Sequence, residues 1–300
     1  MACLGAIQYD PASAVSKVIS SLLAMTAFDT TNARITFTVP SNGKVLVRQR
    51  VNLHGSTTPG RILLGVLESA TVKSRIAPMG HYMQAILATT MVSQEANYVI
   101  DGLTPGASLT WDAAYGVEIV AAAGNLRYGG PNDTTADNAY GALVFEVWEA
   151  TNCLASKLYD PASAATLSTT ALLAMTAMDT TNLRLTFTVP PSGRVLWRVK
   201  AGFHGSTTTG QVLIGVMESS TVRGRVAPVM TVGAGSLATA ILSCNGSGVV
   251  TGLTPGAVLT WDAAYGVETI SGAGGLKHGG PNDTTTDNAF GATAFEIWSV

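Results

Sequence analysis

The sequence repeats itself once, from the first half of the chain to the second. When the 300 residues are shifted by 150 positions, the two halves align without a gap, and more than half of the positions carry the same residue. A repeat of this length is a whole domain, because solenoid repeats are only about 20–50 residues long. We therefore expect two tandem domains, residues 1–150 and 151–300, with no Gly/Ser-rich or Pro-rich linker between them.

Apolar and polar residues alternate with a period of two in both halves. Val45, Val47, Val51 and Leu53 occupy alternate positions, and Arg48 and Arg50 fall between them. This pattern is typical of β-strands with one face on a core. Further strands are expected at residues 34–39, 61–67, 82–88, 96–103, 109–117 and 141–148, and again 150 positions later.

Turn-forming residues separate the expected strands. In Leu103-Thr104-Pro105-Gly106 the order of Pro and Gly suits a type II turn. Residues 11–23, which contain several Ala and Ser, are the one stretch with a composition suited to a short helix. About eight short strands per half at regular spacing predict an all-β fold of two tandem antiparallel β-sandwiches.

Charged residues are scarce in this chain. They make up 12% of the sequence beside 47% hydrophobic residues, and the net charge is −2. This balance excludes a disordered chain and gives no basic surface for nucleic acid or an anionic membrane. The apolar stretch at residues 22–28 is too short to span a bilayer, which takes about 20 residues. A surface with so little charge is expected to be covered by other subunits.

The N-terminus and the cysteines indicate where the protein is made. The first residues have no basic region followed by an apolar run, so we expect no signal peptide and synthesis in a reducing cytoplasm. Cys3 and Cys153 occupy equivalent positions, whereas Cys244 has no counterpart in the first half. Three scattered thiols form neither a disulfide framework nor a zinc motif, and no cofactor is expected.

Two sets of residues invite a catalytic interpretation, and both are better explained without one. His54 and Ser56 recur 150 positions later, but no nucleophile elbow surrounds them. Asp112 and Glu118 are six residues apart on one expected strand, about 20 Å, which is too far for a glycosidase pair. We interpret them as solvated charges on the strand face, and we expect no catalytic residue and no enzyme.

The loops before the last expected strand of each half are rich in oxygen ligands. They contain Asp133 and Asp137 in the first half and Asp283 and Asp287 in the second. These carboxylates are weak candidates for calcium, because the spacing is not that of an EF-hand and no Glu closes the site. Turns stabilised by Asp and Asn side chains are the favoured explanation, so no metal is expected.

The tryptophans fall into two groups by their position along the strands. Trp111 and Trp261 share the apolar strand face and are predicted to lie in the core. Trp148 and Trp298 share a strand face with Glu146 and Glu296, opposite the face of Phe145 and Phe295, and should point outward. Because large aromatic residues are enriched at protein interfaces, Trp148 and Trp298 are candidate subunit contacts.

Each half resembles the C1q/TNF-like jelly-roll domain. The likeness rests on four stretches: Phe37-Thr38-Val39-Pro40 with the strand that follows, Ile62–Val66, the Gly102–Gly106 turn leading to Trp111, and the strand Phe145–Trp148. Modules of this composition are similar to minor structural proteins of tailed bacteriophages. The resemblance implies a jelly-roll fold, compact trimers and binding through surfaces, and it carries no catalytic residue onto this sequence.

Two functions of different classes follow from these observations. The first is a non-enzymatic bacteriophage virion protein, either a capsid decoration or a tail-associated protein, which acts in a homo-oligomer, expected to be a trimer, and contacts other virion proteins. The alternative is a receptor- or carbohydrate-binding module at a tail tip, where two copies raise the avidity for host surface glycans. The segments 79–94 and 230–244 diverge most between the halves and are predicted to face different neighbours.

Overall fold

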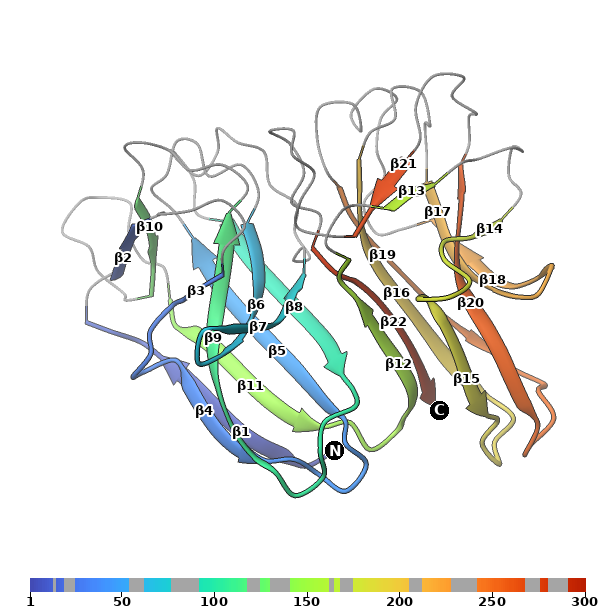
Figure 1. The fold of residues 1–300 in the computed structure, drawn as a ribbon, viewed down its shortest axis with the longest axis horizontal. Helices are drawn as coiled ribbons and strands as arrows, with labels where there is room; N and C mark the ends of the chain where they lie inside the picture. Colours follow the sequence, from blue (N-terminus) through green and yellow to red (C-terminus); the bar gives the residue numbers. More distant parts are fainter. Residues whose placement is uncertain are drawn as a thin grey trace. The chain divides into compact units, whose positions relative to one another are not determined.

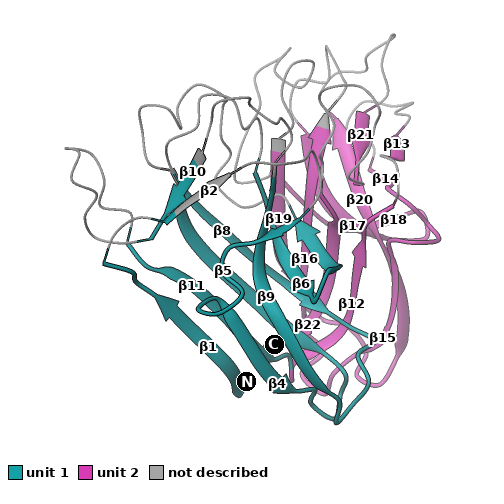
Figure 2. Cartoon of the chain, turned by 60° about the vertical axis from the view of Figure 1, so that its left-hand side comes forward, with its two compact units in different colours: residues 1–150, 282–289 teal, residues 151–281, 290–300 magenta. Residues whose placement is uncertain are grey.

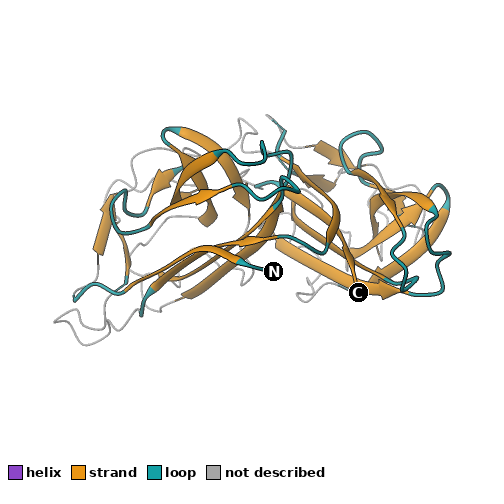
Figure 3. Ribbon diagram, turned by 90° about the horizontal axis from the view of Figure 1, so that it is seen from below, coloured by secondary structure: helices purple, strands orange, loops and turns teal. Residues whose placement is uncertain are grey.

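The structure is a computed structural model of the chain. It describes residues 1–12, 15–18, 25–53, 62–76, 92–117, 125–129, 141–161, 165–167, 175–204, 212–227, 242–267, 276–279 and 291–300. Every regular element in these ranges is a β-strand (Figure 3), as predicted. The chain divides into two compact units (Figure 2), unit 1 with Met1–Ala150 and unit 2 with Thr151–Pro281 and Phe290–Val300.

Unit 1 is an antiparallel β-sandwich (Figure 1). One sheet has the order β1 (Cys3–Tyr9), β11 (Leu143–Glu149), β5 (Val45–Leu53) and β8 (Val92–Ile100). In the other sheet β9 (Ser108–Val117) pairs with β3 (Thr26–Ala27), β4 (Arg34–Thr38) and β6 (Ile62–Glu68), and β6 also pairs with β7 (Thr71–Ile76). A separate two-stranded ribbon joins β2 (Val15–Val18) to β10 (Asn125–Tyr128).

Unit 2 repeats this arrangement strand for strand. Its first sheet contains β12 (Cys153–Tyr159), β22 (Thr293–Ser299), β16 (Val195–His204) and β19 (Leu242–Val250), with β21 (Leu276–His278) and β13 (Ala165–Leu167) continuing from β16. In its second sheet β20 (Val258–Val267) pairs with β14 (Thr176–Ala177), β15 (Arg184–Thr188) and β17 (Val212–Glu218), and β17 also pairs with β18 (Thr221–Val226). The structure therefore shows a duplicated β-sandwich.

The strand order within each unit is that of a jelly roll. If only the described strands of five or more residues are counted in chain order, the first, eighth, third and sixth form one sheet. The second, seventh, fourth and fifth form the other. Two interlocked Greek keys produce this order, which places the chain's early and late strands next to each other in the same sheet.

The alternating pattern in the sequence becomes the core of each sandwich. On β5, Val47, Val51 and Leu53 are fully buried, whereas Arg48 and Arg50 are exposed. Trp111 and Trp261 are also fully buried, as predicted, and each packs edge-on against a phenylalanine of the adjacent strand at centroid distances of 4.8 and 5.1 Å. These aromatic pairs add to the apolar area that stabilises each sandwich.

The predicted turns have the backbone geometry that their residues favour. Gly106 has φ +78°, and the Ala107 amide donates to the Thr104 carbonyl at 3.1 Å, which is the geometry of a type II turn with Pro105 before Gly. The Asp29 carboxylate accepts hydrogen bonds from the Thr31 and Asn32 amides at 2.7 and 2.8 Å. Both motifs recur in unit 2, so the repeated sequence produces repeated turns.

Some expected elements differ from those of the structure. The stretch 11–23 forms no helix in its described part, where Val15–Val18 is strand β2 instead. The strand expected at 96–103 runs from Val92 to Ile100, and the strands β1, β7 and β10 were not expected. Pairing with β11 explains β1, since a partner strand supplies hydrogen bonds that no local pattern reveals. Residues 82–88 lie outside the described part of the chain.

Candidate interaction surface on the first sheet

One group of predicted site residues lies outside the described residues. This group contains the weak calcium candidates Asp133, Asp137, Asp283 and Asp287, together with His54 and Ser56. Most of the divergent segments 79–94 and 230–244 falls there as well. Within the described residues, no three His, Cys, Asp or Glu side chains gather in a group suited to a metal ion.

Trp148 and Trp298 have the same local geometry in the two units. The Trp148 indole nitrogen donates a hydrogen bond of 2.9 Å to the Glu146 carboxylate, two residues earlier on β11. The Trp298 indole donates equally to Glu296 at 2.9 Å. In unit 1 the intervening side chain belongs to the core, so Trp148 and Glu146 share the opposite face of β11, which we call the outward face of the sheet. Trp148 is partly exposed there, whereas Trp298 is only 7% exposed.

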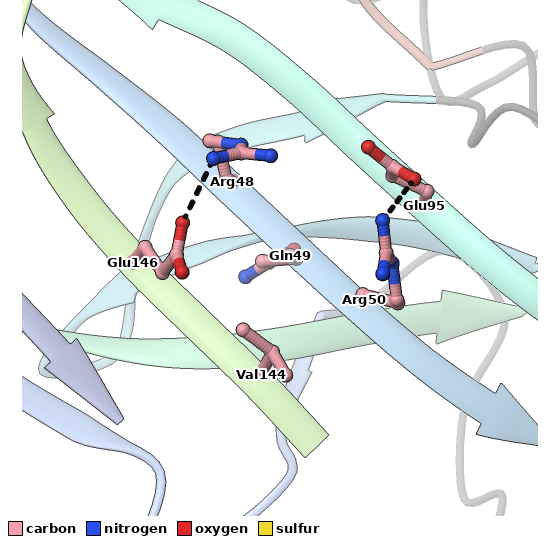
Figure 4. Close-up of a pocket in the computed structure, with 6 residues that line it drawn as sticks. All are labelled: Arg48, Gln49, Arg50, Glu95, Val144 and Glu146. Carbon is pink, nitrogen blue, oxygen red and sulfur yellow. Dashed lines mark hydrogen bonds and ion pairs between the residues drawn. The ribbon is translucent and has the colours of Figure 1, made fainter. Parts of the chain in front are cut away.

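Two ion pairs cross the outward face of unit 1 (Figure 4). Arg48 on β5 lies 3.2 Å from the Glu146 carboxylate on β11, and Arg50 lies 3.0 Å from Glu95 on β8. Strand register explains both contacts, because Arg48 is directly opposite Glu146 and Arg50 is directly opposite Glu95. Together with Val144 and Gln49, these four residues line a shallow depression.

Gln49 lies under this depression and points the other way. It is 1% exposed, and its side-chain amide donates to the Gly65 carbonyl on the second sheet at 2.7 Å. A buried amide bonded in this way fixes the distance between the two sheets at this point. The depression therefore has a floor that is tied to the core, and its polar groups for a partner come from the Arg and Glu side chains.

An apolar row crosses the same face beside the ion pairs. The register places Cys3 opposite Trp148, Trp148 opposite Leu46, and Leu46 opposite Val99. In unit 2 the same register aligns Cys153, Trp298, Leu196 and Val249, and Val249 is 54% exposed. The row lies on the face away from the sandwich core, and its exposure is uneven: Trp148 is partly exposed, whereas Leu46 and Val99 are 7% and 2% exposed.

The outward faces of the two units differ in charge. Unit 2 keeps the first ion pair as Arg198 and Glu296, at 3.4 Å. At the positions of Arg50 and Glu95 it has Lys200 and Asn245, so the second ion pair has no equivalent. The duplicated domain has therefore retained the Trp–Glu–Arg group in both copies and varied the surface beside it.

Asp112 departs from its predicted role as a solvated charge. Its side chain is 3% exposed, and both carboxylate oxygens accept from the Arg34 guanidinium, at 2.6 and 2.9 Å. The hydrogen bond to Asp112 and then its charge raise the pKa of Arg34. Asp262 and Arg184 repeat this pair. The prediction failed because it considered one strand alone, whereas Arg34 reaches Asp112 from the adjacent strand. Glu118 lies outside the described residues.

Sequence reasoning also missed the partners of Arg48 and Arg50. It placed both arginines on the face away from the core, but the carboxylates that they contact are distant in the chain. Only the pairing of β5 with β11 and β8 brings these charges together. The assembled face offers a partner guanidinium donors, carboxylate acceptors and the indole of Trp148.

Comparison with known proteins gives no match by sequence and several by structure. No protein-family model and no curated protein match the sequence. A solved structure of N-glycanase F (PNGase F) is 9% identical, with a TM-score of 0.40 and 99% of each chain covered. The tandem CBM22-1–CBM22-2 domain of Paenibacillus barcinonensis Xyn10C is 9% identical, with a TM-score of 0.22, covering 99% of this chain and 94% of that one. The infectious bursal disease virus VP2 subviral particle is 9% identical, with a TM-score of 0.25, covering 97% and 79%.

The match to N-glycanase F, an enzyme, contradicts the prediction that this chain is not an enzyme. That prediction rested on the lack of a catalytic motif in the sequence, and a fold can assemble reactive groups from distant segments without one. At these identities and TM-scores the matches give this chain no reaction, substrate or partner. In the described residues, no helix is long and apolar enough to cross a membrane.

Proposed function

We propose that the chain is a structural protein of a bacteriophage virion, in a capsid decoration or a tail, and that it works through protein–protein contacts in a symmetric homo-oligomer. The observation that carries this proposal is the apolar row on the outward face. The same strand register produces this row in both units. Interfaces combine such an apolar centre with Trp and Arg side chains. Trp148 and Arg48 supply these residue types in unit 1.

The scarcity of charge supports the same conclusion. With 12% charged residues, the surface has few groups that would keep copies of the chain apart in solution. A closed assembly covers such a surface and leaves the charged residues at its rim. Contacts with other virion proteins would cover the remaining neutral surface.

A trimer of C1q/TNF-like modules is the form of assembly that we propose. The jelly-roll strand order of each unit agrees with the resemblance in sequence. Three chains with two jelly rolls each would present six similar domains around one axis. Such an object suits a position between threefold and sixfold neighbours, which explains why one domain would be duplicated in a single chain.

The oligomeric state of the purified protein tests this proposal. We expect mass photometry at nanomolar and light scattering at micromolar concentration to give a mass of three times 30.9 kDa. Cryo-electron microscopy of intact particles should then locate the protein in the capsid or the tail. A stable monomer at micromolar concentration, together with no density in any particle, would contradict the proposal.

A receptor- or carbohydrate-binding module at a tail tip is the second candidate. The observation in its favour is the partly exposed Trp148, held by Glu146 beside the Arg48 guanidinium. An indole flanked by hydrogen-bonding groups suits a sugar ring. A glycan array with and without Ca²⁺ tests this function, and binding that disappears in Trp148→Ala would favour it over the first candidate.

A further inference from the structure

One of the differences between the cores of the two units lies in an aromatic cluster of unit 1. In unit 1 the Phe28 ring lies 4.9 Å, centroid to centroid, from the rings of both Tyr115 and Tyr128. The Tyr128 hydroxyl donates a hydrogen bond of 2.8 Å to the Phe28 carbonyl. Tyr128 is fully buried, so this bond satisfies a polar group inside the core.

In unit 2 a methionine and a histidine replace two aromatic members of this cluster. Met178 stands at the position of Phe28, and His278 stands at the position of Tyr128. His278 is also fully buried, and its Nδ1 lies 2.9 Å from the Thr293 hydroxyl. Among the described residues, its Nε2 has no hydrogen-bond partner, and neither has the buried Tyr265 hydroxyl. Unit 2 thus encloses an imidazole with one nitrogen unsatisfied.

The surroundings of His278 offer little to a positive charge. The rings of Phe203 on β16 and Tyr159 on β12 lie at centroid distances of 6.4 Å, and Ala165 is opposite on β13. Lys277 precedes His278 on β21 and points to the other face of that strand.

Asp179 is the acidic group that acts on His278 among the described residues. Its carboxylate already accepts hydrogen bonds from the Thr181 amide and from the amide and side chain of Asn182, at 2.8, 2.8 and 2.9 Å. Burial therefore lowers the pKa of His278 to about 4, and the charge of Asp179 only partly opposes this effect.

We propose that His278 makes unit 2 an acid-sensitive element of the chain, which loosens in mildly acidic solution while unit 1 remains closed. Protonation would place a charge in a core site where, among the described residues, the Thr293 hydroxyl is the polar partner and the Asp179 carboxylate is engaged in its own turn. The strands that hold His278 would open first, because β21 contacts β13 and the end of β16 through a few residues only. Tyr128 stays neutral in acid, so the equivalent position of unit 1 gains no charge.

The sign of the effect follows from the two protonation equilibria. A histidine of the unfolded chain has a pKa of about 6.5, so the unfolded state binds the proton first as the pH falls. Stability from neutral His278 is present above pH 6.5 and is lost as the pH falls from there towards 4. Between pH 7 and pH 5 the unfolding equilibrium constant of unit 2 should rise about 20-fold from this residue.

Hydrogen exchange with peptide-level mass spectrometry tests the proposal on the full chain. We expect the opening equilibrium of peptides covering 195–204 and 276–279 to rise about 20-fold between pH 7 and pH 5, after correction for intrinsic exchange rates. The equivalent peptides of unit 1, 45–53 and 125–129, should change several-fold less. His278→Gln should remove most of the difference between the units, and Tyr128→His should introduce the same dependence in unit 1. Equal pH dependence in both units, or an unchanged dependence in His278→Gln, would overturn the proposal.

A direct titration keeps the proposal testable if a variant fails to fold. Selective ¹³C labelling of the histidine rings allows the His278 imidazole to be followed by NMR in the unaltered protein. We expect it to remain neutral down to at least pH 5 in the folded state. An imidazole that titrates near pH 6.5 without loss of the folded spectrum would overturn the proposal, because the charged ring would then be tolerated in the core.

Discussion

The Trp148 indole donates a hydrogen bond of 2.9 Å to the Glu146 carboxylate, and Arg48 contacts the same carboxylate at 3.2 Å. These contacts restrict the rotation of an aromatic side chain that would otherwise be free on a sheet surface. A side chain that is fixed before a partner arrives loses less conformational entropy on binding. The outward face of unit 1 is therefore pre-organised, and Trp148 is the residue through which to test it.

Replacing Trp148 by Ala should weaken self-association. Central tryptophans of interfaces contribute about 2 kcal/mol or more to binding, so we expect the dissociation constant to rise about 30-fold or more. Sedimentation velocity over a concentration series measures this change. Thr36→Ala is the matched control, because Thr36 is an exposed residue of the other sheet and pairs only with Thr110. Unchanged association of Trp148→Ala would show that the outward face is not the contact.

The same substitution at Trp111 should act on stability instead. Trp111 is 0% exposed and packs on Phe37 at 4.8 Å, so Trp111→Ala removes a large buried ring and leaves a cavity. We expect a loss of about 3–5 kcal/mol in the free energy of unfolding of unit 1. For Trp148→Ala the expected loss is below about 1 kcal/mol. Urea denaturation of both variants provides the comparison, and equal losses would contradict the assignment of Trp111 to the core and Trp148 to the surface.

The periodic strands were the most predictable part of the fold. From Val45 to Leu53 the alternation alone identifies a strand and the face that carries Val47, Val51 and Leu53 into the core. Gly106 likewise reveals its turn, because Pro followed by Gly suits one backbone geometry. Strand β1 could not be found in this way, since Cys3–Tyr9 lacks a regular alternation and depends on pairing with β11.

The candidate surface was predictable only in part. The alternation of side chains along β11 places Trp148 on the same face as Glu146, and the structure shows a hydrogen bond between them. Arg48 and Arg50 contact carboxylates on neighbouring strands. Those contacts depend on the register between strands, which the tertiary fold determines. For the same reason the sequence did not reveal that Asp112 is buried against Arg34.

Gly65 should tolerate no side chain. A Cβ at this position would lie 2.0 Å from the Ser74 carbonyl oxygen and 2.8 Å from the Met25 methyl group, so backbone atoms of β7 would have to move. We expect Gly65→Ala to lower the free energy of unfolding of unit 1 by about 3 kcal/mol or more. Urea denaturation measures this loss.

Gly102 is the matched control for Gly65. A Cβ there meets nothing within 4 Å, and the only cost comes from the left-handed backbone at φ +76°. We expect Gly102→Ala to cost about 1 kcal/mol. If Gly102→Ala were as destabilising as Gly65→Ala, backbone conformation rather than the close approach of β6 and β7 would govern both positions.

Cys244 should make unit 2 less stable in alkaline solution. Burial raises the pKa of its thiol to about 12, whereas a cysteine of the unfolded chain ionises near pH 8.5. The folded state keeps the proton, so this stability is present below pH 8.5 and is lost as the pH rises towards 12. Between pH 8 and pH 10 we expect the free energy of unfolding to fall by about 1–2 kcal/mol, and Cys244→Ala should reduce this pH dependence in urea denaturation.

In the folded protein a thiol reagent at pH 8 should modify the exposed Cys3 and leave Cys244 unmodified until unit 2 unfolds. Modification of both at the same rate would contradict the burial of Cys244.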